Sequence, residues 1–534
     1  MRLFSLCLLL RFALAQDDNN TQGWTEASWG GIQPSQDLHW VPCYTGDYQC
    51  ARLQVPLDYY RDDGGSSEDN STAAIALIRL PANVSRDSPD YLGPVLFNPG
   101  GPGVSGVGQA LELGARHRAV LGPQFDVVGF DPRGIQRSTP RIEFYATPAE
   151  RAFNYRPLTE LNHSSSENVA SYWAHTKTMG ALAYERGKEY LPYMNTEFVA
   201  RDMLKIVEAH GKKKLMYWGF SYGTALGYTF ASIFPDKVER MVLDGVCDNE
   251  DYYTANWLNG LQDADESLNW FFRACQEAGP NSCPFYEDSV EAIEDKFSRI
   301  QNALLESPMS VWTNDRSSYG LVDYSFLRNH LFLGGLLNPQ LWRPLAEGLQ
   351  ALAEGDATVL YGAFKDPPFD CDCSDASHFG QFTPNPEANA AFICNDGDAV
   401  PPELEAAYEH YRRSAEVSSF GSIYSCVRIQ CNGWSSEIPK ARFRGPIAGN
   451  TSFPILFIGN TADPITTHAS ALKVSQNFPG SVVLTQDSPG HTTLGIPTTC
   501  MHDVVREYFI EGTLPKEGTV CRLDRSPFDV PSSN

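Results

Sequence analysis

The sequence has few basic residues for its length, and beyond its first residues it has no long apolar run. Lys and Arg total 41 against 65 Asp and Glu, which gives a formal net charge of −24. This excess of negative charge argues against nucleic acids and anionic membranes as partners, because both would repel it. After the N-terminal segment, no stretch approaches the roughly 20 apolar residues that a membrane-spanning helix needs. We therefore expect a soluble globular protein with neither kind of partner.

The cysteines and histidines do not follow the spacing of metal ligands. Cys371 and Cys373 form a C-x-C pair, but no second cysteine pair or histidine stands at the spacing of a zinc site. We therefore expect no metal and no cofactor, and we expect these two cysteines to form disulfides. No internal repeat is evident either.

The N-terminus is typical of a secretory signal peptide covering residues 1–15. Arg2 precedes an apolar run at residues 3–10, and Ala-Leu-Ala at residues 13–15 suits a cleavage site. Arg11 interrupts this pattern. The alternative is a buried N-terminal helix, which the polar stretch that follows disfavours.

The cysteine count also fits an oxidising compartment. The sequence has 13 cysteines, and loss of Cys7 with the signal would leave an even number. From proximity we hypothesise that Cys43 pairs with Cys50 and Cys500 with Cys521, and the other eight allow 105 pairings. Sequons for N-glycosylation, which fit an extracellular surface, occur at Asn19, Asn70, Asn83, Asn162 and Asn450. We therefore expect a secreted protein.

From about residue 72 to residue 245, apolar segments typical of strands alternate with segments typical of helices or loops. The predicted strands are residues 72–79, 94–98, 125–130, 215–218 and 238–243, after opening strands within residues 39–60. This alternation predicts a mostly parallel sheet with helices on both faces.

Helical periodicity dominates the next part of the chain. The predicted helices there are residues 258–278, 289–305, 341–353 and 402–415. Strands return at residues 454–458 and 482–485. The simplest organisation is an α/β core formed by residues 16–248 and 444–534, interrupted by a mainly helical cap at residues 249–443.

A candidate nucleophile lies at the junction of a strand and a helix. Residues 215–218 are apolar and aromatic, as in a buried strand, and residues 222–234 are small and apolar, as in a helix packed on a sheet. Between them, residues 219–223 match G-x-S-x-G with Ser221 at the centre. Strand, tight turn with serine and helix form the nucleophile elbow of an α/β-hydrolase. Glycines flank the serine because the strand and helix approach too closely for side chains.

A serine hydroxyl is a poor nucleophile at neutral pH unless a base stands beside it. In α/β-hydrolases the acid and then the histidine follow the serine along the chain. Asp463 comes just after the predicted strand at residues 454–458, and His491 comes after the one at residues 482–485. Both therefore have the expected order and setting, and they are the candidate acid and base for Ser221.

Other side chains compete for these two roles. His468 stands where a helix is expected to begin, and His502 lies within a helical stretch, so both are more typical of surface or packing histidines. Asp244 and Asp487 also end predicted strands. Asp244 is the stronger rival, although carboxylates at strand ends often only cap the following turn.

The oxyanion that forms during attack on a carbonyl needs N–H donors that are already in place. Tyr222 directly follows the nucleophile and would supply one backbone amide. Gly100 and Gly101, in the loop after the strand at residues 94–98, would supply the other, since glycine lets the backbone approach the substrate. The alternative for this loop is an ordinary Pro/Gly turn.

Four motifs together resemble one known family. They are NPGGPG at residues 98–103, FDPRGIQRS at 130–138, GFSYGT at 219–224 and GNTADPIT at 459–466. With the opening WVPCYTGDYQCARLQVPLDY and the C-terminal segment that runs through SPGHTTL, they are similar to the proline iminopeptidase and tripeptidyl aminopeptidase family of α/β-hydrolases. The resemblance covers nearly the whole mature chain and is weakest over the cap, where AAFICNDGDA is the familiar patch.

By position, this resemblance implies Ser221 as nucleophile, His491 as general base and Asp463 as its orienting acid. It implies an oxyanion hole formed by the backbone amides of Gly101 and Tyr222. Two departures stand out.

The first departure is Asn98-Pro99, which stands where iminopeptidases have a histidine, and this favours the tripeptidyl branch. The second is that His491 is followed by Thr-Thr rather than by the more usual glycine.

The leading hypothesis is a secreted serine exopeptidase that removes short N-terminal peptides or single residues, with peptides as its substrates. Such an enzyme needs a carboxylate for the substrate ammonium, and no single acid of the cap is selected by the sequence. A carboxylesterase or another hydrolase of small acyl substrates is the alternative. A catalytically inactive binding protein is disfavoured, because all three catalytic positions are filled.

Overall fold

The computed structural model of the chain describes residues 24–60, 71–154, 166–313, 318–365, 385–438 and 442–529. The predicted signal peptide, the C-x-C cysteines and the sequons at Asn19, Asn70 and Asn162 lie outside these ranges. The other two sequon asparagines, Asn83 and Asn450, are exposed. Across the described ranges, no helix combines the length and the apolar character needed to cross a membrane.

A 10-stranded sheet forms the core, in the order β1-β2-β3-β5-β4-β6-β7-β10-β11-β12. Neighbouring strands are antiparallel from β1 to β5 and parallel from β5 to β12. The strands are β1 (Val41–Pro42), β2 (Gln49–Pro56), β3 (Thr72–Leu80), β4 (Gly93–Asn98), β5 (Phe125–Asp131), β6 (Leu215–Phe220), β7 (Val238–Asp244), β10 (Leu456–Ala462), β11 (Val482–Pro489) and β12 (Val520–Arg522). The mostly parallel sheet predicted from the sequence is confirmed.

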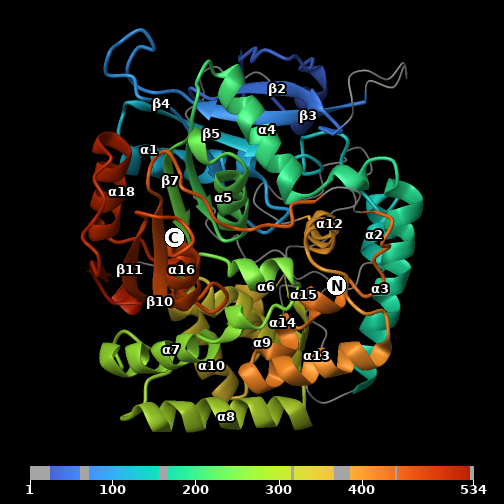
Figure 1. Cartoon of the computed structure of the whole chain (residues 1–534). Helices are drawn as coiled ribbons and strands as arrows, with labels where there is room; N and C mark the ends of the chain where they lie inside the picture. The colour runs from blue at the N-terminus through green and yellow to red at the C-terminus, as the bar shows by residue number, and fades with distance from the viewer. Residues whose placement is uncertain are drawn as a thin grey trace.

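Helices cover both faces of this sheet (Figure 1). One face carries α4 (Thr196–Ala209), α5 (Tyr222–Ile233) and α16 (His468–Ser475), and the other carries α1 (Gly106–Leu121) and α18 (Thr499–Glu511). Successive strand residues serve opposite faces: Leu96 packs with the first layer and Val95 with the second. Each such fully buried side chain contributes about 1.5–3 kcal/mol of hydrophobic stabilisation. Short helices η1 (Glu26–Gly31), η3 (Leu191–Tyr193), η4 (Pro235–Lys237) and α17 (Thr492–Gly495) complete this part, whereas η8 (Pro527–Asp529) packs against the cap through Phe528.

The cap forms a separate layer next to the sheet edge, with a hydrophobic cluster of its own (Figure 1). Its helices are α6 (Asn249–Tyr253), η5 (Asn259–Leu261), α7 (Ala264–Ala278), α8 (Val290–Glu306), α9 (Tyr324–His330), the π-helical η6 (Leu331–Leu336), η7 (Pro339–Leu341), α10 (Trp342–Ala353), α11 (Thr358–Phe364), α12 (Pro386–Asp396), α13 (Leu404–Val417), α14 (Gly421–Tyr424) and α15 (Cys426–Ile429). A hairpin of β8 (Met309–Trp312) and β9 (Tyr319–Val322), which the sequence did not predict, lies among them.

The chain before the elbow also contributes to this layer. After α2 (Pro148–Asn154), the long helix α3 (Ser166–Gly187) runs beside the cap (Figure 1). Val169 and Tyr172 of α3 pack against Ala407 and Ile429 of the inserted segment. The layer next to the sheet edge therefore contains helices from two separate parts of the chain, the inserted cap and the segment before the elbow.

Disulfides are present in both parts. The hypothesised pairs Cys43–Cys50 and Cys500–Cys521 are confirmed, and Cys275–Cys283 and Cys394–Cys431 are additional bridges. Cys247 and Cys426 are free thiols.

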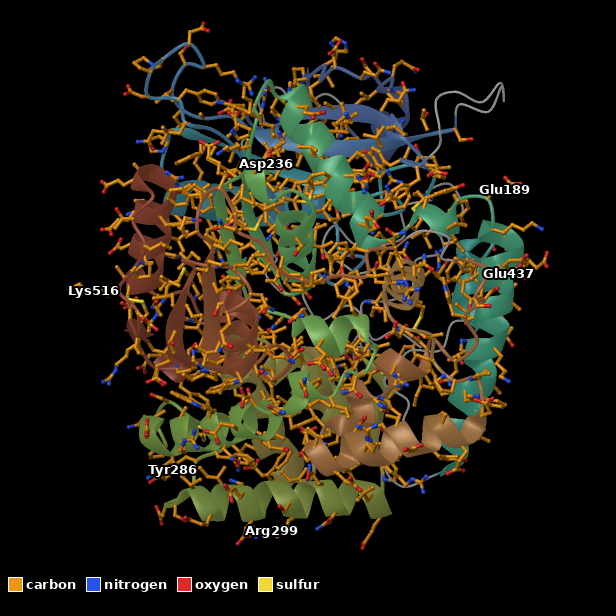
Figure 2. The ribbon with its side chains drawn as sticks, viewed as in Figure 1. Glu189, Asp236, Tyr286, Arg299, Glu437 and Lys516 are labelled. Atoms are coloured by element: carbon orange, nitrogen blue, oxygen red, sulfur yellow. A yellow bond between two sulfur atoms is a disulfide. The ribbon has the colours of Figure 1, made fainter. Side chains whose placement is uncertain are left out.

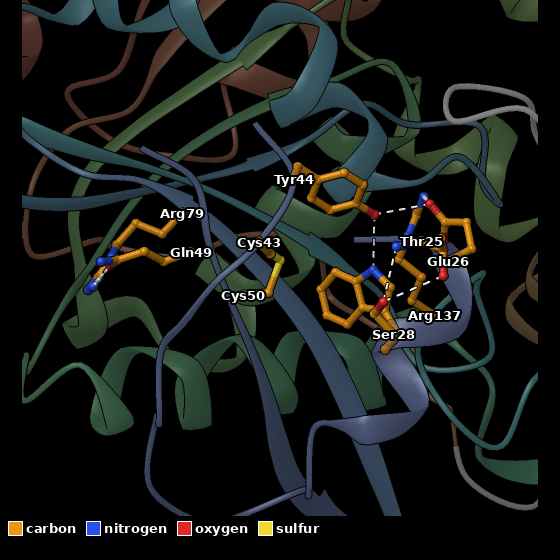
Figure 3. Close-up of a disulfide and its surroundings, with 10 residues drawn as sticks. Thr25, Glu26, Ser28, Cys43, Tyr44, Gln49, Cys50, Arg79 and Arg137 are labelled. Atoms are coloured by element: carbon orange, nitrogen blue, oxygen red, sulfur yellow. Dashed lines mark hydrogen bonds and ion pairs between the residues drawn. A yellow bond between two sulfur atoms is a disulfide. The ribbon is translucent and has the colours of Figure 1, made fainter. Parts of the chain in front are cut away.

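Figure 3 shows the first bridge beside a polar cluster of N-terminal residues. In that cluster the Tyr44 hydroxyl accepts a hydrogen bond from the Trp29 indole and donates one to Glu26, which also pairs with Arg137. Charged residues far from this cluster, such as Glu189, Arg299, Glu437 and Lys516, lie at the outside of the molecule and are exposed (Figure 2).

Candidate active site

Ser221 lies at the turn between β6 and α5, where its backbone has φ 55° and ψ −123°. Glycine alone adopts this region readily, so serine here costs on the order of 1–3 kcal/mol. Two glycines permit the turn: a Cβ on Gly219 would lie 2.4 Å from the Gly223 carbonyl oxygen, and one on Gly223 would lie 2.6 Å from the Asn98 carbonyl oxygen. The Ser221 side chain is partly exposed at this strained turn.

His491 and Asp463 meet after neighbouring parallel strands. The His491 Nδ1 atom is 3.0 Å from Asp463 Oδ2 and 3.1 Å from Oδ1. The Asp463 side chain is fully buried, whereas 16% of the His491 side chain is exposed. If Nδ1 carries the proton that Asp463 accepts, Nε2 is left with a free lone pair and can act as a base.

The carboxylate of Asp463 is held ionised by its surroundings. Burial alone would raise its pKa, but the facing imidazole of His491 and the backbone amides of Thr492 and Ile465 outweigh burial and lower the pKa below its ordinary value. These amides donate to Oδ2 and Oδ1 at 2.9 and 3.0 Å. An ionised, oriented acid next to a histidine is the arrangement that a general base requires.

The end of β7 connects the serine to this pair. The Ser221 amide donates to the Asp244 carbonyl at 3.0 Å. A Cβ on the next residue, Gly245, would lie 2.5 Å from Thr492 Cγ2 and 3.0 Å from Thr466 Oγ1. The same backbone thus touches the elbow on one side and the loops of Asp463 and His491 on the other. All these residues follow the carboxyl ends of adjacent parallel strands, which meet at one sheet edge.

The loop after β4 lies directly against the elbow. A Cβ on Gly100 would be 2.8 Å from Ser221 Cβ and 3.0 Å from the Tyr222 nitrogen. Tyr222 is the first residue of α5, so its N–H has no acceptor within the helix. Gly101, the other predicted donor, has φ 109°, which requires glycine. Loop and helix start therefore lie where an oxyanion hole is expected.

The competing residues have other partners. Asp244 accepts the Thr493 amide at 2.9 Å and also binds the Thr493 hydroxyl. His468 begins α16, as predicted, and its Nε2 lies 2.8 Å from the Thr485 hydroxyl. His502 lies within α18, and Asp487 accepts from the Thr461 hydroxyl at 3.1 Å. The structure thus brings His491 together with Asp463, while Asp244 supports the adjacent Thr493.

Two residues that sequence reasoning did not single out support the pair. The Thr466 hydroxyl is 2.8 Å from Asp463 Oδ2 and 3.0 Å from His491 Nδ1. The Asn460 side-chain amide donates to the carbonyls of Gly490 and Thr492 at 2.8 Å each, which fixes the loop around His491. Both belong to the GNTADPIT motif, which was the available signal.

Thr492, the first of the two threonines after His491, has φ 58°. This is a strained value for a β-branched residue. It occurs at the position where the resembling family more often has glycine, so the departure noted in the sequence places strain directly next to His491.

The buried carboxyl of Asp244 should make the stability of the protein depend on pH. Burial raises the pKa of its carboxyl from 3.8 to about 6. Between these values the folded protein holds a proton that the unfolded chain has released, so this group lowers the free energy of unfolding as pH rises from 4 to 6. Asp244→Asn removes this pH dependence. The difference in free energy of unfolding between variant and wild type should therefore shift by about 3 kcal/mol in favour of the variant from pH 4 to pH 7. Urea unfolding at a series of pH values measures this, and parallel pH profiles of the two proteins would contradict it.

Two family models match this chain. The model described as alpha/beta hydrolase fold matches residues 93–315, and the model described as TAP-like protein matches residues 415–521. The two matches cover the elbow and the segment with Asp463 and His491, respectively.

Curated relatives match over most of their length. Serine protease Hip1 of Mycobacterium tuberculosis is 30% identical over 508 residues, which cover 91% of this chain and 91% of the relative. Tripeptidyl aminopeptidase of Streptomyces coelicolor is 25% identical over 492 residues, covering 90% and 84%. Carboxylesterase B of M. tuberculosis is 28% identical over 478 residues, covering 89% and 86%. The chain therefore belongs to the α/β-hydrolase family that includes the tripeptidyl aminopeptidases and Hip1, and it is a serine hydrolase.

Proposed function

We propose that this protein is a secreted serine exopeptidase that releases short peptides or single residues from the N-terminus of peptides, with Ser221, His491 and Asp463 as its catalytic triad. The observation that carries the proposal is the contact between His491 Nδ1 and the buried Asp463 carboxylate beside the strained elbow of Ser221. Secretion is supported by the signal-like N-terminus and by the four disulfides of the described residues.

In the proposed mechanism, Ser221 Oγ attacks the carbonyl carbon of the scissile bond while His491 Nε2 takes the hydroxyl proton. The tetrahedral oxyanion accepts hydrogen bonds from the Gly101 and Tyr222 amides. His491 then gives its proton to the leaving amine, and an acyl-enzyme remains on Ser221. Water repeats the sequence: His491 takes a proton from it, the hydroxide adds to the acyl carbon, and the proton returns to Ser221 as the acid leaves.

Contacts of the cap with the catalytic loops support an enzyme that admits a chain end. The Leu337 carbonyl of the cap accepts the His491 amide at 3.0 Å, and a Cβ on Gly490 would lie 2.6 Å from Pro339. On the other side, the Asn385 amide donates to the Gly103 carbonyl at 3.0 Å. A roof that touches both sides of the site restricts the approach of a long folded substrate. The relative named tripeptidyl aminopeptidase points in the same direction.

The second candidate is a carboxylesterase, which the relative named Carboxylesterase B favours. The same triad hydrolyses esters, because an alkoxide leaving group needs less help from the general acid than an amine does. The two candidates differ in what they require of the substrate, since the exopeptidase must bind a free ammonium group.

Substrates matched in all but the N-terminus test the proposal. A tripeptidyl amide with a free N-terminus is expected to have kcat/KM about 10 to 100 times that of its N-acetylated form, the equivalent of one charge-assisted hydrogen bond of roughly 1.5–3 kcal/mol. Simple p-nitrophenyl esters provide the comparison. Turnover of the esters alone would overturn the peptidase proposal and favour the esterase.

A further inference from the structure

Helix α12 (Pro386–Asp396) belongs to the cap, yet its first turn contacts the loop of Gly101 and its last residue is linked through Thr196 to the side chain of Tyr222. It lies between the sheet and the rest of the cap (Figure 1). Nine of its residues are buried, on all sides of the helix. The Cys394–Cys431 disulfide and the Asn395 side chain, which donates to the Leu191 and Met194 carbonyls, anchor it on both sides. A helix held in this way is a rigid support.

The first turn of α12 holds the glycine loop. The Asn389 side-chain amide donates to the Pro102 carbonyl at 3.0 Å, and a Cβ on Gly103 would lie 2.8 Å from the Asn385 carbonyl oxygen. Gly100, Gly101 and Gly103 have φ between 99° and 109°, and none has a side chain that could pack and hold the loop. Within the loop, Asn98 Oδ1 accepts the Gly100 amide at 3.0 Å. Contacts with α12 directly after Gly101 add a second support for the position of its amide.

The last residue of α12 holds the other donor through a chain of hydroxyl groups. Asp396 Oδ2 accepts the Thr196 hydroxyl at 2.6 Å, and the Thr196 oxygen lies 2.6 Å from the Tyr222 hydroxyl, which must then be the donor. Asp396 also accepts the Tyr252 hydroxyl at 2.7 Å. The Tyr222 ring packs on Phe392 of the same helix at 6.1 Å between centroids. All five residues are buried.

We propose that α12 positions the two amides of the oxyanion hole. Asn389 positions the Gly101 amide through its hydrogen bond to the Pro102 carbonyl. Asp396 positions the Tyr222 amide through Thr196, which contacts the Tyr222 hydroxyl. Donors work only if they stand about 2.7–3.1 Å from the developing oxyanion. A displacement of about 1 Å costs on the order of 100-fold in rate. The inference rests on the proposed function, and it gives the cap a direct role in the rate of the chemical step.

The test uses full-length variants Asn389→Ala, Tyr222→Phe and Asp396→Asn. Tyr222→Phe keeps the backbone amide and removes the hydroxyl alone. Each is expected to lower kcat about 10 to 100-fold and to leave KM within about threefold, because a donor lost outright costs on the order of 10² to 10³ in kcat. Affinity for a peptidyl boronic acid, whose tetrahedral adduct uses the same hole, should fall in proportion to kcat, while inhibition by the released peptide should not change.

Coupling separates the two arms of the proposal. Tyr222→Phe combined with Asp396→Asn should lose no more than about the larger single effect, since both act through one chain. In the double variant Asn389→Ala with Asp396→Asn, the fold-reduction in kcat should equal the product of the two single reductions, because the two arms act independently. Glu387→Gln is the matched control: Glu387 is buried on the same helix but pairs with Arg151, and its variant should keep wild-type kcat.

The outcomes are distinct. Variants that fold and keep kcat, or that lose kcat while boronic acid affinity stays constant, overturn the role of α12. An equal loss in Glu387→Gln overturns it as well, because helix stability alone would then explain the effect. Labelling by a fluorophosphonate separates the proposals: an unlabelled wild type refutes the proposed function and this inference with it, whereas a labelled wild type with variants labelled at the same rate refutes only the inference.

Discussion

Ser221→Ala is expected to reduce kcat by about 10⁴ to 10⁶-fold, because the variant lacks the atom that forms the acyl-enzyme. KM or inhibitor binding should change little, and the fold should remain intact, since the hydroxyl is partly exposed at the turn. Steady-state kinetics and circular dichroism measure the two effects. A fluorophosphonate should label wild type at Ser221 and leave the variant unlabelled.

Two further variants separate chemistry from structure. Ser232→Ala, in the helix α5 that follows Ser221, removes a hydroxyl that donates to the Tyr228 carbonyl. This variant should keep kcat within about threefold of wild type. Ser221→Gly should be as inactive as Ser221→Ala but more stable by about 1 kcal/mol or more, because glycine adopts φ 55° without strain. Substantial turnover by Ser221→Ala would remove the serine from its proposed role.

His491→Ala is expected to lower kcat by a similar factor, on the order of 10⁴ to 10⁶-fold, since it leaves the serine hydroxyl without a base. Asp463→Asn should lower kcat by about 10⁴-fold. An amide N–H that donates to Nδ1 favours the tautomer with the proton on Nε2, which then cannot accept the proton of Ser221. The loss should appear in kcat rather than in the binding of a released peptide. Kinetics with the same peptidyl amide measure both variants.

His468→Ala and Asp244→Asn are the matched controls for base and acid. His468 binds the Thr485 hydroxyl and Asp244 binds Thr493. The kcat of each variant should therefore fall by at most about tenfold, the equivalent of one hydrogen bond. If His468→Ala inactivates the enzyme while His491→Ala does not, the assignment of the base is wrong. The corresponding reversal for the two carboxylates would assign the acid to Asp244.

Much of the site was predictable because its signals are local. The strand, turn and helix around Ser221 lie within about twenty consecutive residues, and apolar runs with flanking glycines specify all three. Asp463 and His491 could be proposed because parallel strands end at one edge of a sheet, so a residue just after a strand is placed by the strand. The short-range disulfides Cys43–Cys50 and Cys500–Cys521 followed from proximity in the same way.

Helix α12 shows where local signals end. It is buried on all sides, so it lacks the apolar stripe that marks a surface helix, and the sequence did not predict it. Helix α3 comes from the chain before the elbow but packs on the cap, so its association with the cap depended on long-range packing. The bridge Cys394–Cys431 joins segments 37 residues apart, and no spacing rule selects it among the other pairings.

The sequence by itself determined the fold class, the positions of the strands along the chain and the candidate residues for a triad, because hydrophobic periodicity and turn chemistry act over a few residues. Only the tertiary structure decided that His491 contacts Asp463 while Asp244 binds Thr493, that Asn389 of the cap contacts the loop beside Ser221, and that Asp396 is linked through Thr196 to the Tyr222 side chain. These choices depend on distances between side chains that are far apart along the chain, and such distances exist only once the core has packed.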